Sequence, residues 1–77
     1  MLSVRVRFYA SLREHFGQTE REVTVDEGAL VSDVVNQLAP EALRGGLQCA
    51  VNDSFVHGDT RLHQGDILDL LPPFGGG

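Results

Sequence analysis

Residues 2–9 alternate between apolar and polar side chains, and no other feature constrains the fold of this chain as strongly. The apolar set comprises Leu2, Val4, Val6 and Phe8, and the polar set comprises Ser3, Arg5, Arg7 and Tyr9. A period of two is typical of a strand that buries one face and leaves the other face open. The first strand therefore requires a covering layer, which the rest of the chain must supply.

A helical pattern supplies that layer. Apolar residues recur at helical spacing over about residues 30 to 39, at Leu30, Val31, Val34, Val35 and Leu38. Asp33 suits the positive end of the helix dipole, and Pro40 favours an end to the helix. Leu30 stands where a Thr-type cap is expected, which costs about 1 kcal/mol of stability.

Shorter segments complete the expected order. We expect a helical turn over residues 10–16 that ends at Gly17, and strands over residues 21–25, 47–51, 55–56 and 67–71. Gly45-Gly46 marks a break, and Asn52-Asp53-Ser54 a turn. Leu68 and Leu70 of the last strand face inward. One helix on one face of a mixed sheet of four to five strands is an α+β architecture.

Composition limits the class of partner. Seventy-seven residues make one domain, and a net charge of −5 disfavours nucleic acid and anionic membranes as partners. No apolar run approaches the roughly 20 residues of a membrane span, and the N-terminus has no signal-peptide pattern, so we expect a cytoplasmic protein. All six basic residues are arginines, so no lysine of this chain can be acylated.

The last six residues form a slender tail. Pro72 and Pro73 favour an extended base, and Phe74 leads into three glycines at positions 75, 76 and 77. Fully extended, such a segment reaches roughly 20 Å and lets another backbone approach closely. The reactive group at its tip is the Gly77 carboxylate. An inert, disordered end is the alternative interpretation.

Four stretches together carry a family resemblance. They are residues 6–14 (VRFYASLRE) with Gly17, residues 31–35 with Leu38, Val51-Asn52 with Leu62 and Gly65-Asp66, and the tail at residues 72–77 (PPFGGG). In these stretches the chain resembles the MoaD/ThiS family of ubiquitin-like sulfur carriers, and most closely the MoaD branch, the small subunit of molybdopterin synthase. The three-glycine ending is reminiscent of the thiazole (ThiS) branch, and Phe74 replaces a more usual valine.

The resemblance implies a ubiquitin-like β-grasp domain over residues 1–71 and a flexible tail over residues 72–77. It also implies that the chain has no catalytic site and binds no cofactor. A ubiquitin-activating-type (MoeB-like) enzyme would use ATP to adenylate the Gly77 carboxylate. A sulfur donor such as a cysteine desulfurase or rhodanese would convert it to a thiocarboxylate. The tail, comprising Pro72, Pro73, Phe74, Gly75, Gly76 and Gly77, would enter a MoaE-like large subunit and give sulfur to cyclic pyranopterin monophosphate.

Strand parity predicts a partner surface. The first and last strands of a β-grasp sheet are neighbours, so the sheet face opposite the helix carries Arg5, Arg7 and Tyr9 beside Ile67, Asp69 and Leu71. The exposed apolar groups expected to contact the partner are Tyr9, Ile67, Leu71 and Phe74.

Other candidate sites are weaker. Cys49 has inward parity, where cysteine behaves as a small hydrophobe. His57, Asp59 and His63 lack a recognised metal-ligand spacing, so we expect no metal site. Three functions stay open besides molybdopterin synthesis: a carrier for thiazole synthesis, a ubiquitin-like protein modifier, and a binding module with an inert tail.

Overall fold

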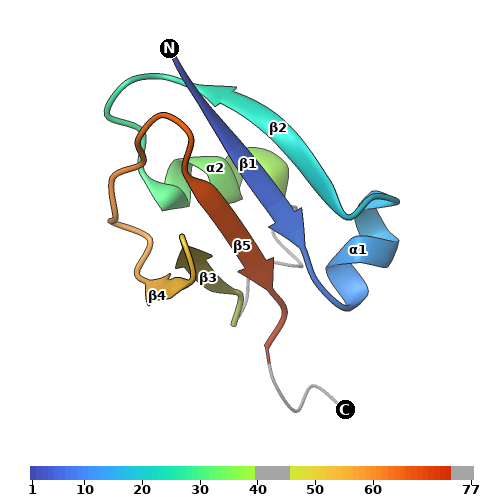
Figure 1. Cartoon of the computed structure of the whole chain (residues 1–77). Coiled ribbons are helices and arrows are strands. Elements are labelled where there is room, and N and C mark those ends of the chain that lie inside the picture. The colour runs from blue at the N-terminus through green and yellow to red at the C-terminus, as the bar shows by residue number, and fades with distance from the viewer. Residues whose placement is uncertain (40–45, 74–77) are drawn as a thin grey trace.

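The computed structural model describes residues 1–39 and 46–73. The elements are, in chain order, β1 (Leu2–Phe8), α1 (Ser11–Phe16), β2 (Glu20–Val25), α2 (Val31–Leu38), β3 (Gln48–Val51), β4 (Ser54–Val56) and β5 (Ile67–Leu71). The strands form one five-stranded sheet in the order β2-β1-β5-β3-β4 (Figure 1). The expected mixed sheet with one main helix is confirmed.

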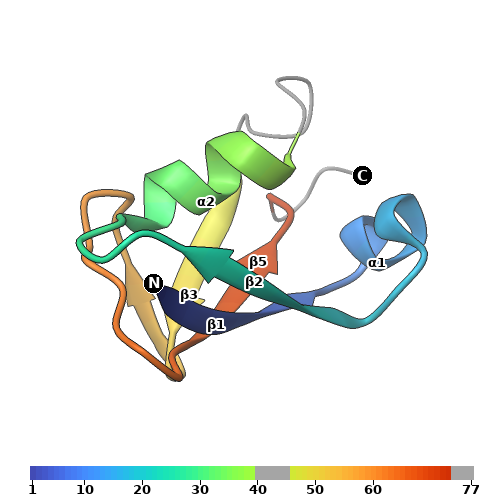
Figure 2. The same cartoon turned by 90° about the horizontal axis from the view of Figure 1, so that it is seen from above.

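The two terminal strands lie side by side at the centre of the sheet. β1 pairs with β5 in parallel, with Val6 opposite Leu68, and pairs with β2 in antiparallel orientation. β3 is antiparallel both to β5 and to β4. The helix α2 lies over one face of this sheet (Figure 2). The other face has no helix over it in the described ranges, so it is open to a partner.

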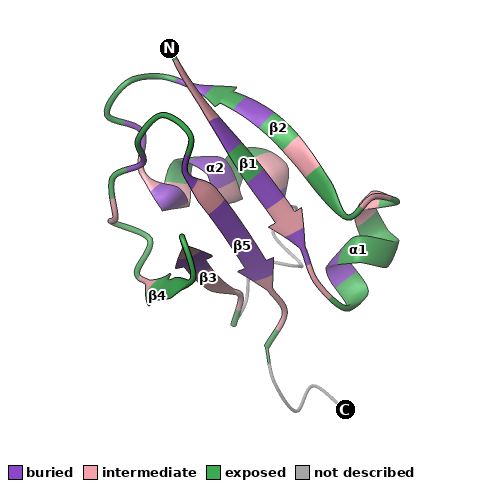
Figure 3. Cartoon of the chain, viewed as in Figure 1, coloured by how far each residue is buried: buried purple, intermediate pink, exposed green. Residues whose placement is uncertain are grey.

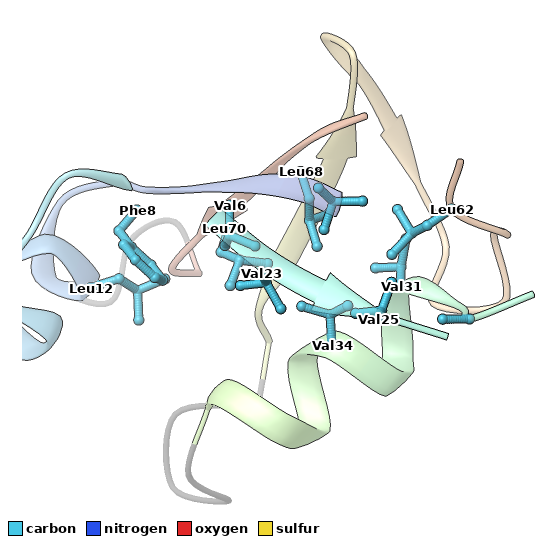
Figure 4. Packing of buried hydrophobic residues seen from close by; sticks show 12 residues of the cluster. Val6, Phe8, Leu12, Val23, Val25, Val31, Val34, Leu62, Leu68 and Leu70 are labelled. Carbon is cyan, nitrogen blue, oxygen red and sulfur yellow. The ribbon is translucent and has the colours of Figure 1, made fainter. Parts of the chain in front are cut away.

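The core lies between the sheet and α2, where the predicted parities place it. Val6, Leu68 and Leu70 have no exposed surface, and Phe8 is 2% exposed. Figure 4 shows Val6 and Leu70 on the side of the sheet that faces Val34 of the helix, with Phe8 farther along beside Leu12. Figure 3 shows buried positions alternating along β1. This burial pattern fixes the strand register, because a shift of one residue would turn every apolar side chain outward.

A small aromatic cluster holds α1 against the end of β1. The rings of Phe8 and Phe16 stack with centroids 4.3 Å apart. The Arg21 guanidinium lies 5.9 Å from the first ring and 5.7 Å from the second. The helix ends at Gly17, whose φ of 70° is the left-handed value that glycine adopts without strain. Ala10 precedes the helix and is not part of it, contrary to the prediction.

The start of α2 is capped by a distant loop rather than by its own N-cap side chain. Leucine offers no hydrogen-bond acceptor at position 30, and the first helical amides instead donate to the carbonyls of Thr60 and Gly58, each at 2.9 Å. The Leu30 amide in turn donates to Asp33 Oδ2 at 2.8 Å. The loop after β4 therefore completes the helix. No helix in the described parts of the chain is long and apolar enough to cross a membrane.

Candidate functional site

The structure describes the base of the predicted tail. β5 ends at Leu71, after which Pro72 is half-buried and Pro73 is exposed. Phe74, Gly75, Gly76 and Gly77 lie outside the described residues. The tail that ends in the Gly77 carboxylate thus begins at the end of a strand whose central residues are buried.

Gly46 contacts the tail base. A Cβ atom placed on Gly46 would lie 3.0 Å from Pro73 Cβ, closer than side chains normally approach. The φ of Gly46 is +73°, which also favours glycine. The chain entering β3 therefore packs against the first residues of the tail. The sequence predicts only a break at Gly45-Gly46, because the contact with Pro73 joins residues far apart in the chain.

An ion pair lies at the centre of the open sheet face. The register places Arg7 opposite Asp69 and Arg5 opposite Ile67, as expected. Arg7 donates two hydrogen bonds to Asp69, from Nε at 2.6 Å and from a terminal nitrogen at 3.0 Å. Asp53 adds a longer contact at 3.6 Å. The hydrogen bonds to Asp69 raise the pKa of the Arg7 guanidinium further above its usual range.

The apolar residues expected to be exposed on this face are half-buried instead. Ile67 and Leu71 are flanked by strands on both sides, and the Tyr9 ring has the Arg7 guanidinium 6.0 Å from its centroid. Within the described residues, the exposed large hydrophobics are Met1 and Phe55. The register aligns Phe55 with Ala50 and Asp69, so the Phe55 side chain lies on this face as well. The exposed apolar surface of the open face therefore lies at its β4 edge and not at Tyr9, Ile67 or Leu71.

A polar network fixes the start of β5. The Asn52 side chain donates to Asp66 Oδ1 and accepts from the Ile67 amide, both at 3.0 Å. The second oxygen of Asp66 accepts from the His63 amide at 2.8 Å. This network ties the β3–β4 turn to β5, so these residues have a structural role. The sequence predicts that Asn52 lies in a turn and identifies Asp66 only as part of the family resemblance, so it does not predict the hydrogen bonds between them.

The weaker candidates do not assemble into a site. Among the described residues, no three His, Cys, Asp or Glu side chains group as metal ligands, and His57, Asp59 and His63 are exposed. Cys49 is half-buried, and its burial raises the pKa of the thiol. A thiol held in its neutral form is a poor nucleophile.

Comparisons with known proteins agree with this geometry. The model of the ThiS family matches residues 6–77. A Pyrococcus furiosus protein described as molybdopterin converting factor subunit 1 is 27% identical over 95% of this chain and 99% of its own, with a TM-score of 0.83. Small archaeal modifier protein 1 of Methanosarcina acetivorans is 25% identical over 100% of this chain and 98% of its own, with a TM-score of 0.77. The Helicobacter pylori complex of subunits 1 and 2 of molybdopterin-converting factor contains a chain that is 26% identical over 99% of this chain and 100% of its own, with a TM-score of 0.69.

Proposed function

The chain belongs to the ThiS family of ubiquitin-like sulfur carriers, and we propose that it carries sulfur as a thiocarboxylate on Gly77 for molybdopterin synthesis. The observation that supports this proposal is the path of β5. Leu68 and Leu70 anchor the strand in the core, and the strand leads directly to Pro72 and the tail. Only a few residues then separate a rigid domain from its terminal carboxylate.

The proposed chemistry activates a poor electrophile. A carboxylate would have to expel oxide, so an oxygen of Gly77 first attacks the α-phosphorus of ATP in the adenylating enzyme and pyrophosphate leaves. The outer sulfur of a persulfide on the donor then adds to the acyl carbon and displaces AMP, which gives an acyl disulfide between Gly77 and the donor. A second thiol attacks the donor-side sulfur and forms a new disulfide with it, and Gly77 leaves as the thiocarboxylate. Catalytic groups and bound ATP belong to the partners in this scheme, and we place the reaction in the cytoplasm. This chain contributes the acyl group and the surface that presents it.

The proposed acceptor is bound by a large synthase subunit. Support comes from the Helicobacter pylori relative, which is a complex of subunits 1 and 2 of molybdopterin-converting factor. We propose that the partner covers the open face along β5, from Ile67 at the start of the strand to Leu71 and Tyr9 beside the tail base, and contacts Phe74. A partner bound there would reach the end of β5 at Leu71, where the tail begins, and could enclose the tail.

The first experiment is an intact-mass measurement. The chain is incubated with ATP, a cognate adenylating enzyme and a sulfur donor, and a variant lacking Gly77 is treated in parallel. We expect the full chain to gain the mass that corresponds to replacing one oxygen with sulfur, and the variant that lacks Gly77 to show no gain. An unchanged mass, with an enzyme that thiocarboxylates a known carrier, would refute the proposal.

The second experiment tests the partner surface. Leu71→Asp should weaken binding to the large subunit about tenfold or more, because a charge replaces an apolar group at the interface. Thr24→Asp is the matched control, since Thr24 is exposed on the edge strand β2 and lies far from the tail base. Titration calorimetry gives both affinities, and urea unfolding shows whether each variant folds. Equal affinities for both variants would place the interface elsewhere.

Two other acceptors have specific support. The family match and the three-glycine ending favour thiazole synthesis, and the likeness to small archaeal modifier protein 1 favours attachment to proteins. Growth of a molybdopterin-deficient strain and of a thiamine-requiring strain, each supplied with this chain, separates the two carrier pathways. Gly77-dependent conjugates in cell extracts would support the modifier.

A further inference from the structure

A recessed surface lies on the opposite side of the sheet from the open face. It is a groove of about 700 Å³ between α2 and the hairpin formed by β3 and β4. Its apolar lining includes Val31, Val35, Leu47, Cys49 and Val56. No Asp, Glu, Lys or Arg of the described residues lines it. In a chain in which 22% of residues are charged, such a lining suits an apolar occupant.

The groove borders an open strand edge. β4 is the last strand of the sheet, and no described residue pairs with its outer side (Figure 1). Figure 3 shows most of this strand as exposed. Phe55 at its centre is 68% exposed, which among the described large hydrophobic residues is second to Met1. An apolar, uncovered edge of this kind is a template for another strand.

The hydrogen-bond pattern shows which backbone groups this edge presents. Asn52 and Asp53 form a two-residue loop with φ of 49° and 73°, so the flanking pair, Val51 and Ser54, is hydrogen-bonded. The next pair, Ala50 and Phe55, is then not hydrogen-bonded. The Asn52 amide donates to the Ile67 carbonyl at 2.9 Å, which agrees with this alternation. The N–H and C=O of Phe55 therefore point away from β3, toward the open edge.

Acidic residues lie at both ends of the edge. Asp53 precedes β4, and although it lies 3.6 Å from Arg7 its side chain is 88% exposed. Asp59 follows β4 and is also exposed. Their charges add to a chain whose net charge is −5. A strand lying along β4 would thus meet apolar surface at its centre and negative charge at its ends.

We propose that the β4 edge and the adjoining groove bind an extended peptide of a partner protein by strand addition. The peptide donates to and accepts from the Phe55 backbone, and its alternate aliphatic side chains enter the groove. Lysine or arginine residues flank the aliphatic segment and face Asp53 and Asp59. The groove lies on the α2 side of the sheet, whereas the register places the Phe55 side chain on the open face, in line with Ala50 and Asp69. The edge therefore lies between the two faces. None of the groups that bind the peptide belongs to the tail, so the proposal does not depend on the sulfur-carrier function.

The test uses a fluorescein-labelled peptide, Lys-Lys-Val-Ile-Val-Ile-Lys-Lys, and the full-length protein. Anisotropy titration should show saturable binding, and a peptide with glutamate in place of every lysine should bind more weakly. In ¹⁵N-edited NMR spectra, the amide shifts of residues 31–36, 47–49 and 54–58 should move. Shifts confined to the open face around Arg7 would overturn the proposal.

Two variants and a control test the mechanism. Phe55→Pro removes the outward N–H and should weaken binding about tenfold, whereas Phe55→Ala keeps that donor and should cost much less. Val35→Gln introduces a polar group into the groove and should also weaken binding about tenfold. It provides the test should Phe55→Pro fail to fold.

Three results would contradict the proposal: no saturable binding by the wild-type chain, equal affinities for folded Phe55→Pro and Phe55→Ala, or full affinity in Val35→Gln. Sedimentation analysis addresses a different occupant. A dimer that dissociates in Phe55→Pro would assign the edge to a second copy of the chain and would likewise overturn the proposal.

Discussion

At the scale of single residues, the Arg7–Asp69 pair combines burial with charge. Asp69 is 6% exposed and both of its oxygens accept hydrogen bonds from Arg7. A carboxylate so placed depends on its partner, since removal of the cation leaves a buried charge uncompensated. The pair also crosses from β1 to β5, so it fixes the strand that leads to the tail.

The first prediction follows from that dependence. Arg7→Met should lower the free energy of unfolding more than the double variant Arg7→Met/Asp69→Leu does, because the double variant removes both charges. Urea unfolding of the four members of this double-mutant cycle measures the coupling. If the losses in free energy of unfolding of the two single variants simply added up in the double variant, the buried Asp69 carboxylate would not depend on Arg7, and the prediction would be wrong.

The second prediction concerns Cys49 and pH. Burial raises the thiol pKa, so the folded chain keeps its proton at pH values where the unfolded chain, near an ordinary pKa of about 8.5, has lost it. The free energy of unfolding should therefore fall as the pH rises above about 8.5. Cys49→Ala should remove this part of the pH dependence. Alkylation of Cys49 at pH 8 should be several-fold slower in the folded chain than in urea, and equal rates would contradict the prediction.

At the scale of elements, the turn between β1 and α1 holds a strained residue. Ala10 has φ 51° and ψ −128°, and the Leu12 amide donates to the Tyr9 carbonyl at 3.1 Å. These angles are those of the first central residue of a type II′ turn, where glycine is favoured. Alanine in this conformation is strained, and the strain lowers the free energy of unfolding.

The third prediction is that Ala10→Gly stabilises the chain. Relief of the strain exceeds the entropy that glycine adds to the unfolded state, so the free energy of unfolding should rise by about 1 kcal/mol. In a domain of this size, about 1 kcal/mol corresponds to a Tm increase of roughly 4–8 °C. Ser11→Gly, at the first residue of α1, is the control and should give no increase. A lower Tm in Ala10→Gly would show that the turn tolerates alanine without strain.

The elements illustrate what sequence can predict. Periodicity located β1, β5 and α2 because each buries one face, and burial follows side-chain order directly. Periodicity did not predict how α2 begins, because the carbonyls of Thr60 and Gly58 that accept hydrogen bonds from its first amides belong to a loop more than 25 positions away. It also included Ala10 in α1, since alanine favours helices and nothing local shows a positive φ.

At the scale of the whole molecule, the same limit applies to the site. The tail is expected from its prolines and glycines, and residues 74–77 lie outside the described residues. The register that sets Arg7 beside Asp69 could be predicted from strand parity together with the family resemblance. The packing of Gly46 on Pro73 and the exposure of Phe55 could not, since both depend on how distant segments meet. Residues whose roles arise from tertiary contacts leave no periodic pattern in the sequence.

The last prediction tests whether the body of the protein directs its tail. Gly46→Ala should strain the backbone at φ +73° and push against Pro73, whereas Gly17→Ala imposes a similar strain at φ +70° with nothing within 4 Å. Both variants should therefore lose about 1 kcal/mol of stability. Only Gly46→Ala should also slow thiocarboxylate formation, measured by intact mass over time, because it alone displaces the tail base. Equal rates for the two variants would show that the contact with Gly46 does not position the tail for its partner. β5 and the two prolines that follow it would then suffice to present Gly77.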